Sequence, residues 1–286
     1  AVPVLAERMM DGVLAPQTIG YLLAGSLFWI VLATSTALAV WFREGGSNFD
    51  PDRRRVLMLA TPLAAAPLVA AGVGVAVARR GMHVEPVRIP IPGLPRDLDG
   101  LRITQLSDIH FGPFLDRAQL RRAVAMANET RPHIIALTGD LITRRFDDLE
   151  TCMAELSHLR AEAGVYGCHG NHEVYARCQE IATSLGEQYG MRFLRGQATT
   201  LRFGDALLNL AGFDYQRMDT YYLRGAERLR RPDALNIMLQ HNPVAFPRSA
   251  EAGYALMLAG HTHGGQINVE ILHENVNVAR FYTPYV

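Results

Sequence analysis

Lysine is missing from this sequence. All 28 basic residues among the 286 are arginine, which excludes a P-loop lysine, a Schiff-base lysine and the strand lysine of protein kinases. Cysteine is scarce: Cys152, Cys168 and Cys178 form no C-x-x-C pair, and their odd number leaves one unmatched. We therefore expect neither a disulfide framework nor a cysteine metal site, and interpret these thiols as small buried apolar groups.

The chain also lacks an excess of either charge. Its 28 basic residues balance 28 acidic ones, so the formal net charge at pH 7 is zero. Without a global positive field the protein is poorly suited to wrap nucleic acid, and no nucleic-acid partner is indicated. With 49% hydrophobic residues, the composition excludes disorder for the chain as a whole and allows one large domain with or without an appendage.

Charged residues are absent from two stretches, 12–42 and 56–78. Each exceeds the roughly 20 residues that a helix needs to cross ~30 Å of hydrocarbon. We predict a membrane anchor over residues 1–80 with two transmembrane helices, about 18–42 and 56–78. The second stretch is rich in Ala, Val, Pro and Gly, and a buried or re-entrant hairpin arm is its alternative interpretation.

Arginine is distributed unevenly around these stretches. The loop 43–55 between them holds four Arg, whereas only Arg8 precedes the first. The positive-inside rule then places the loop in the cytoplasm and predicts a multi-pass cell-membrane protein whose larger part is extracytoplasmic. The opposite orientation stays open because further Arg follow the second stretch. Arg53–Arg55 and the apolar run after them also resemble a twin-arginine export signal, which an ordinary basic membrane flank explains as well.

Four prolines between residues 81 and 100 predict an extended linker. Beyond it, helical patterns over 116–128, 147–159 and 173–189 alternate with short apolar runs, which predicts an α/β fold. In the first pattern Asp116 is a helix cap, and Leu120, Val124 and Ala127 share one face. Residues 201–203 and 206–210 predict a hairpin around Gly204 and Asp205, so part of the sheet is expected to be antiparallel.

Five apolar runs of strand length end in polar residues, and in α/β folds ligands gather at the carboxyl ends of strands. These ends supply two Asp, one Asn and four His as possible ligands, a set that suits manganese, iron or zinc. Seven ligands are too many for one four-coordinate ion but suffice for two ions that share a carboxylate, the usual device for attack on phosphorus. The runs and the seven possible ligands at their ends are 101–106 with Asp108 and His110, 134–137 with Asp140, 165–168 with Asn171, 235–239 with His241, and 255–258 with His261 and His263. His172 follows Asn171 directly and is not counted among the seven.

The last of these ends has two further features. His261 and His263 lie two residues apart, so in an extended segment they would point to opposite sides and reach two neighbouring ions. Gly260, Gly264 and Gly265 allow the backbone to fold closely around them.

These residues resemble the five ordered motifs of the calcineurin-like metallophosphoesterase superfamily: Asp108-x-His110, Gly139-Asp140, Gly170-Asn171-His172-Glu173, His241 and Gly260-His261-x-His263. The resemblance covers about residues 101–268 and implies a four-layer αββα sandwich of two mixed β-sheets flanked by helices. It also implies how the ligands divide: Asp108, His110 and His263 bind one ion, Asn171, His241 and His261 bind the second, Asp140 bridges both, and His172 is the catalytic group beside the substrate phosphate.

The predicted function is a dinuclear phosphoesterase that cleaves phosphoric ester or anhydride bonds, with a hydroxide between the ions as nucleophile. Its cofactors would be two divalent ions (Mn²⁺, Fe²⁺/Fe³⁺ or Zn²⁺), and its substrate a phosphorylated small molecule or lipid. One alternative is a pyrophosphohydrolase of a lipid- or nucleotide-linked envelope precursor. Another, from a different class, is a non-catalytic scaffold that retains the fold.

Some features depart from the family pattern or stay open. The residues after Asp140 lack the Asp-Arg-Gly element of phosphoprotein phosphatases, and the sequence looks more like bacterial membrane-anchored or exported phosphoesterases. Arg144 and Arg145 could bind a substrate phosphate or belong to a solvated loop. Glu173 could orient His172 or favour a helix start. Relatives normally continue beyond the last residue of this chain, so we expect the domain over 101–286 to be truncated at its C-terminus.

Overall fold

The computed structural model describes residues 81–112, 115–143, 146–216 and 222–263, the backbone of 268–271 and 274–277, and two isolated helical positions, 32 and 35. Residues 1–84 and 85–286 form two compact units. Apart from positions 32 and 35, the predicted transmembrane helices fall outside the described residues, and so does the pair Arg144 and Arg145. Among the helices that are described, none combines the length and the apolar character needed to cross a membrane.

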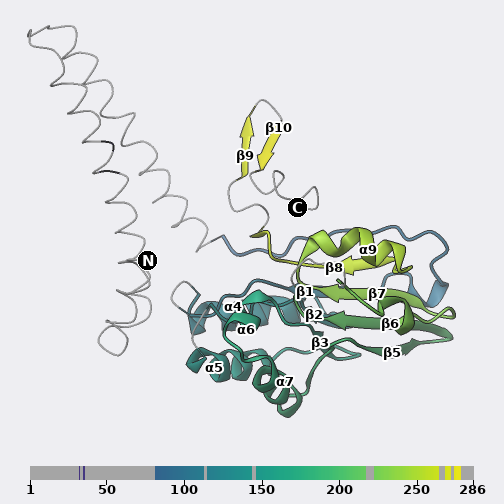
Figure 1. Ribbon diagram of the computed structural model, residues 1–286, viewed down its shortest axis with the longest axis horizontal. Helices are drawn as coiled ribbons and strands as arrows, with labels where there is room; N and C mark the ends of the chain where they lie inside the picture. Colours follow the sequence, from purple (N-terminus) through teal and green to yellow (C-terminus); the bar gives the residue numbers. More distant parts are fainter. Residues whose placement is uncertain are drawn as a thin grey trace, which may run out of the picture. The chain divides into compact units, whose positions relative to one another are not determined.

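One sheet carries the first three predicted ligand-bearing strands. β1 (Ile103–Leu106), β2 (Ile134–Leu137) and β3 (Val165–Gly167) pair in parallel in that order, followed by β4 (Met191–Phe193), which the sequence pattern did not predict. The register places Leu106 opposite Leu137, and Leu137 opposite Gly167. Because the strands end level with one another, the residues that follow them emerge at a single edge (Figure 1).

The second sheet mixes both pairings. β5 (Gln197–Phe203) and β6 (Ala206–Phe213) form the predicted antiparallel hairpin, whose strands extend beyond the expected ranges. β7 (Leu235–Gln240) and β8 (Leu256–Leu258) then add in parallel next to β6. A separate antiparallel pair consists of β9 (Asn268–Ile271) and β10 (Glu274–Asn277).

The first helix follows its sequence signals closely. α4 (Arg117–Glu129) begins after Asp116, whose side chain accepts a hydrogen bond from the Gln119 backbone N–H at 2.9 Å. The Gln119 side chain accepts in return from the Asp116 N–H at 3.0 Å, which completes a capping box. Leu120, Val124 and Ala127 are buried, as predicted.

The helix predicted over 173–189 is wrong as a single element. The structure has two helices there, α6 (Asn171–Tyr175) and α7 (Gln179–Gln188). Arg177 lies between them with φ at 54°, in the left-handed region that no α-helix contains. α5 (Asp147–Leu156) ends earlier than expected.

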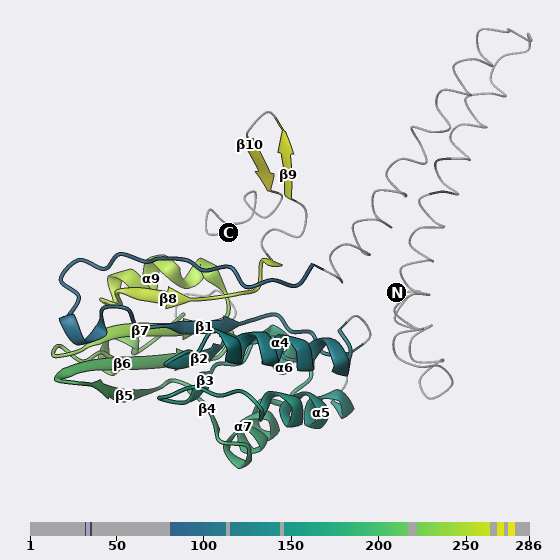
Figure 2. The same ribbon diagram turned by 180° about the vertical axis from the view of Figure 1, so that it is seen from behind.

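Figures 1 and 2 show the helices and sheets of the domain, and three clusters of buried side chains lie between these layers. One lies between α4, α5 and α7 and the first sheet, and includes Leu120, Leu137 and Phe193. The second fills the space between the sheets, with Ile134, Leu208 and Ile237 among its members. The third covers the outer face of the second sheet beside α8 (Ala226–Leu229), η2 (Pro243–Ala245) and α9 (Phe246–Glu251). Helix, sheet, sheet and helix layers therefore form the predicted αββα sandwich.

The segment ahead of β1 is tied to this sandwich at its end. Residues 81–91 adopt no helix or strand, and η1 (Arg96–Leu98) places Leu98 in the cluster between the sheets. The three cysteines are free and buried, which confirms the interpretation of their thiols as apolar core groups.

Candidate metal centre

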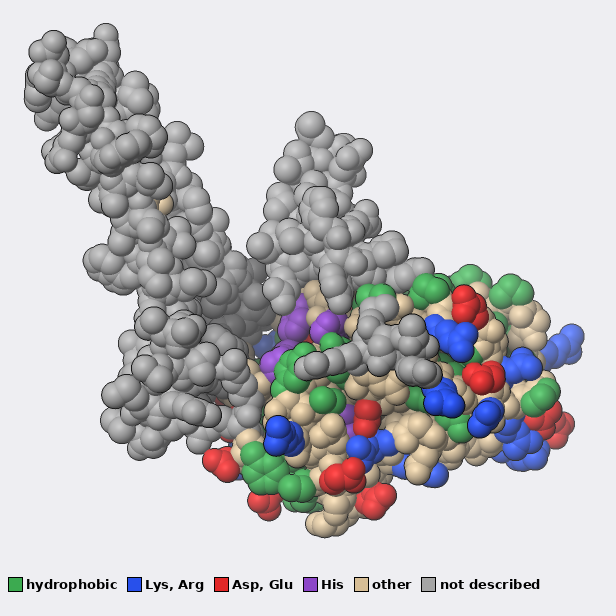
Figure 3. Space-filling model, viewed as in Figure 1, with side chains coloured by type: hydrophobic (Ala, Val, Ile, Leu, Met, Phe, Trp, Pro, Cys, Tyr) green, Lys and Arg blue, Asp and Glu red, His purple; other side chains and the backbone are tan. Residues whose placement is uncertain are grey.

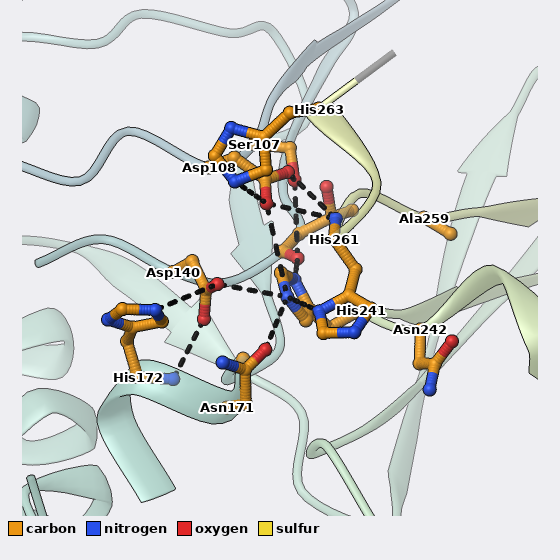
Figure 4. A network of polar contacts seen from close by, with 12 residues as sticks. Ser107, Asp108, Asp140, Asn171, His172, His241, Asn242, Ala259, His261 and His263 are labelled. Atoms are coloured by element: carbon orange, nitrogen blue, oxygen red, sulfur yellow. Dashed lines mark hydrogen bonds and ion pairs between the residues drawn. The ribbon is translucent and has the colours of Figure 1, made fainter. Parts of the chain in front are cut away.

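The seven predicted metal ligands come together at one edge of the sandwich, although they are spread over more than 150 residues of sequence. Figure 4 labels all of them except His110. Asp108 and His110 follow β1, Asp140 follows β2, and Asn171 begins α6 after β3. The other three come from the second sheet, with His241 after β7 and His261 and His263 after β8. The edge where the two sheets meet is therefore the site, and Figure 3 shows histidine side chains grouped at the surface there.

The first group consists of Asp108, His110 and His263. The Nε2 atoms of His110 and His263 lie 3.0 Å apart, and their rings stack with centroids 4.8 Å apart. Oδ1 of Asp108 is 3.4 Å from His263 Nε2. The potential donor atoms of all three residues converge closely enough to hold one ion.

The second group consists of Asn171, His241 and His261. His241 Nε2 is 3.1 Å from Asn171 Oδ1 and 3.2 Å from His261 Nδ1. His241 is fully buried, and its Nδ1 donates a hydrogen bond to the Thr138 carbonyl at 2.7 Å. That bond fixes the tautomer and leaves the Nε2 lone pair facing the other two residues, as ion binding requires.

Asp140 lies between the two groups. Its Oδ2 atom is 3.1 Å from His241 Nε2 and 3.7 Å from His110 Nε2. The residue is only 2% exposed, so its negative charge must be compensated within the site. One carboxylate oxygen in reach of both groups is the arrangement that a shared ligand needs.

His172 flanks the first group. Its ring meets the ring of His110 edge to face with centroids 4.5 Å apart, and its Nε2 lies 4.0 Å from Asp140 Oδ2. Its Nδ1 donates to the Thr143 carbonyl and its backbone N–H donates to Asp140 Oδ1 at 2.9 Å. The ring is thus oriented by Thr143, and Nε2 is the nitrogen that faces the centre.

The backbone at this edge is strained. Five of the seven predicted ligands have φ between 47° and 73°: Asp108, His110, Asp140, His261 and His263. A left-handed conformation costs a non-glycine residue roughly 1–2 kcal/mol, and such strain concentrates at functional sites. His261 and His263 therefore do not lie on an extended segment as expected. They still reach different groups, because the turn directs one side chain to each.

Two glycines make the close approach possible. A Cβ on Gly170 would lie 2.1 Å from Asp140 Oδ1, and one on Gly260 would lie 2.1 Å from Asp108 Oδ2. Any other residue at either position would push a ligand carboxylate away. The expected role of Gly260 is confirmed, whereas Gly264 and Gly265 lie outside the described residues.

Glu173 supports the start of α6, as one of its two sequence interpretations expected, because it accepts a hydrogen bond from the N-cap Gly170 N–H, and it has a further role that neither interpretation foresaw. The side chain is fully buried and accepts hydrogen bonds from four backbone N–H groups. Its Oε2 binds Asp140 N at 2.9 Å and Gly170 N at 2.8 Å, and its Oε1 binds Leu141 N at 2.8 Å and Ile142 N at 3.4 Å. This carboxylate therefore fastens the loop that carries Asp140 to the turn that carries Asn171. The sequence signal was a Glu at the third position of a helix that starts at a ligand.

The electrostatics of the site favour a cation. Burial lowers the pKa of His110 to about 4 and also lowers that of His261, so both imidazoles are neutral at pH 7 and free to bind a metal. Burial alone would lower the pKa of His241, but the adjacent Asp140 carboxylate outweighs it and raises that pKa. Conversely, His241 and His172 lower the pKa of Asp140 against the effect of burial. The carboxylates that attract a proton to His241 would equally attract a divalent ion.

The donor set fits the predicted ions. Imidazole nitrogens and carboxylate or amide oxygens suit zinc, iron and manganese, and the three cysteines lie in the core. Sequence reasoning missed two aromatic residues beside the centre: the Tyr215 ring lies 5.7 Å from that of His261 in the second group, and the Tyr175 ring lies 6.3 Å from that of His172. Isolated tyrosines outside the ligand motifs gave no signal.

Comparison with known proteins agrees with this geometry. A family model described as calcineurin-like phosphoesterase matches residues 101–265. A Bos taurus protein named "Transmembrane protein with metallophosphoesterase domain" is 31% identical over 246 residues, which cover 80% of this chain and 55% of the relative. A Danio rerio protein of the same name is 33% identical over 68% of this chain and 47% of the relative. "Phosphodiesterase YaeI" of Escherichia coli is 28% identical over 60% of this chain and 64% of the relative. The chain spans about half the length of the first two relatives.

Proposed function

The chain belongs to the calcineurin-like metallophosphoesterase family, and on that basis we propose that it is a hydrolase of phosphoric esters that works with two divalent metal ions. The observation that carries the proposal is the position of Asp140 Oδ2, 3.1 Å from a nitrogen of one ligand group and 3.7 Å from a nitrogen of the other. A mononuclear site would need only one of these groups. Each of the seven ligand positions in the family motifs holds a residue that can bind a metal ion, which argues against a non-catalytic scaffold.

The chemistry that two bound ions supply is Lewis-acid stabilisation of the phosphoryl oxygens and a more acidic water. Asp108, His110 and His263 would hold one ion, and Asn171, His241 and His261 the other. Asp140 would be the shared ligand.

His172 is the residue placed to handle a proton. In its protonated form it carries Nδ1–H, which donates to the Thr143 carbonyl, and Nε2–H, which faces the centre. From there Nε2–H can donate to a phosphoryl or leaving-group oxygen. Glu173 holds the backbone of Asp140 and Gly170 in place while this happens.

The proposed substrate is a phosphorylated small molecule or lipid. The name of the Escherichia coli relative supports a diester, and the apolar stretches 18–42 and 56–78 support a lipid-linked ester or pyrophosphate as the second candidate. The names of the two vertebrate relatives support attachment to a membrane. We propose that residues 1–80 supply it and, from the arginine distribution, that residues 101–286 lie outside the cytoplasm.

Turnover by the full chain tests the proposal. The chain purified with Mn²⁺ is assayed against p-nitrophenyl phosphate, its bis ester and a lipid-linked pyrophosphate, with and without a chelator. We expect hydrolysis of at least one ester, loss of activity on chelation and recovery with Mn²⁺. No hydrolysis of any phosphorus ester by a chain that contains its metal would favour the scaffold instead.

A further inference from the structure

A cavity of about 320 Å³ adjoins the metal centre. It is lined by Val174, Tyr175, Arg177 and Tyr215, none of which belongs to a ligand motif. A larger cavity of about 610 Å³ is lined by residues such as Glu180, Arg195 and Asp214, and no predicted metal ligand borders it. No metal ligand lines the smaller cavity either, but two of its lining residues lie against histidine rings of the centre: Tyr215 is 5.7 Å from the ring of His261 and Tyr175 is 6.3 Å from that of His172. The smaller cavity is therefore the one placed to receive part of a substrate held at the centre.

Two tyrosine rings form one side of this cavity, which we call the aromatic wall (Tyr175 and Tyr215). The rings meet at 73° with centroids 6.4 Å apart. Tyr215 lies 5.7 Å from the ring of His261, and Tyr175 lies 6.3 Å from the ring of His172. The wall thus spans from the second ligand group to the histidine that carries the proton.

The fold holds the wall and leaves it accessible. Tyr215 follows β6, and its backbone N–H donates to the His169 carbonyl at 2.8 Å. Tyr175 is the last residue of α6 and is 62% exposed, so a face of its ring is available to a ligand.

Arg177 completes the cavity from a strained position. It is exposed and adopts a φ of 54°, a conformation in which glycine or asparagine would be less costly. Its N–H donates to the Val174 carbonyl at 3.1 Å, which ends α6 and brings the arginine to the cavity. Because Arg177 lines the cavity, its guanidinium is placed to contact a group bound there.

We propose that the aromatic wall and Arg177 form a subsite for a planar ring on the substrate, so that the enzyme prefers phosphoric esters that carry a nucleobase or aryl group. Bases stack on tyrosine faces, and a guanidinium can stack on a ring edge or donate to its acceptor atoms. The cavity volume is at the lower end of the range for small-molecule sites, enough for one such group. This inference rests on the proposed function, which places the phosphate at the metal centre.

Equilibrium binding tests the subsite without relying on turnover. AMP, ribose 5-phosphate and inorganic phosphate are titrated calorimetrically into the Mn²⁺-loaded full chain carrying His172→Asn, which is expected to keep both ions while hydrolysing these esters slowly. AMP and ribose 5-phosphate share the sugar phosphate and differ by the base. We expect AMP to bind about tenfold more tightly, within the range that stacking on an aromatic side chain contributes.

Variants assign this preference to the wall. Tyr215→Leu and Tyr175→Leu should each reduce the AMP preference several-fold, whereas Tyr215→Phe and Tyr175→Phe keep the ring and should retain it. Arg177→Gly removes the guanidinium while easing the backbone, so it should weaken AMP binding without loss of stability. Affinity for inorganic phosphate should stay unchanged in all of them, which shows that the metal centre is intact.

The results separate this inference from the proposed function. Equal affinity for AMP and ribose 5-phosphate, or an AMP preference that survives both Leu variants, would overturn the subsite even if esters are hydrolysed. AMP selectivity that depends on the tyrosines in a chain that hydrolyses no ester would retain the subsite and reject the enzyme.

Discussion

Replacing Glu173 by Gln should weaken both the fold and the metal site. The carboxylate accepts four backbone N–H bonds, two on each oxygen. Glutamine keeps one oxygen, so two buried N–H groups would face an amide NH₂ that cannot accept from them. At roughly 1–3 kcal/mol for each unsatisfied buried donor, the loss is about 2–6 kcal/mol of unfolding free energy. Such a loss is a large fraction of the about 5–15 kcal/mol that is typical of a folded domain, so the unfolding midpoint should fall measurably.

The same substitution should raise the Mn²⁺ concentration needed for activity, because the loop that carries Asp140 is no longer fastened to Gly170. Urea unfolding of the metal-free chain measures the first effect, and a Mn²⁺ titration of activity measures the second. Glu155→Gln is the matched control: this carboxylate is also buried, but it pairs with Arg117 and Arg121 on α4, away from the centre. It should lower stability and leave the Mn²⁺ dependence alone.

Glu173→Asp, which keeps both oxygens, should recover part of the Mn²⁺ affinity. Burial and the charge of Asp140 raise the pKa of Glu173, whereas its four donors favour the ionised form. If the group were protonated at pH 7, glutamine would imitate it. A Glu173→Gln chain with wild-type stability and an unchanged Mn²⁺ titration would therefore refute the fastening role.

Three other predictions concern the ligands, acid stability and orientation. Asp140→Asn should reduce bound metal below two equivalents per chain, whereas His172→Asn should keep both ions and mainly lower kcat; elemental analysis decides, and two full equivalents in the Asp140 variant would contradict a shared ligand. Hydrogen bonds from Arg121 and Arg117 lower the pKa of Glu155 to about 2. The interaction of ionised Glu155 with these two arginines therefore stabilises the fold fully above about pH 4.5, and this stabilisation is lost as the pH falls toward 2. Urea unfolding between pH 5 and pH 3 should show a shallower loss of stability for Glu155→Gln than for wild type. Fused after Val286 in a bacterial host, alkaline phosphatase should be active and green fluorescent protein dark, and the reverse pattern would place the domain in the cytoplasm.

The order of short apolar runs and polar ends was enough to predict the α/β fold and to single out the seven candidate ligands, whereas the four-layer sandwich was predicted only from the family resemblance that those residues carry. Local sequence is enough to predict strands and the polar turns that follow them. A strand of buried residues must end in a turn, and the residues that form the turn, such as Gly139 and Asp140, directly follow the strand in the sequence. The helix cap at Asp116 and the hairpin at Gly204 were predicted for the same reason. The break between α6 and α7 at Arg177 was not predictable, because arginine seldom adopts the left-handed backbone conformation found there.

Only the tertiary structure decided which atoms face one another. The pairing of His110 with His263 and the position of Asp140 between two groups depend on how two sheets meet at one edge. The four backbone bonds of Glu173 and the wall of Tyr175 and Tyr215 likewise join segments distant in sequence. Sequence spacing carries no information about such contacts, because they arise from packing between layers and from strained turns that the surrounding structure holds in place.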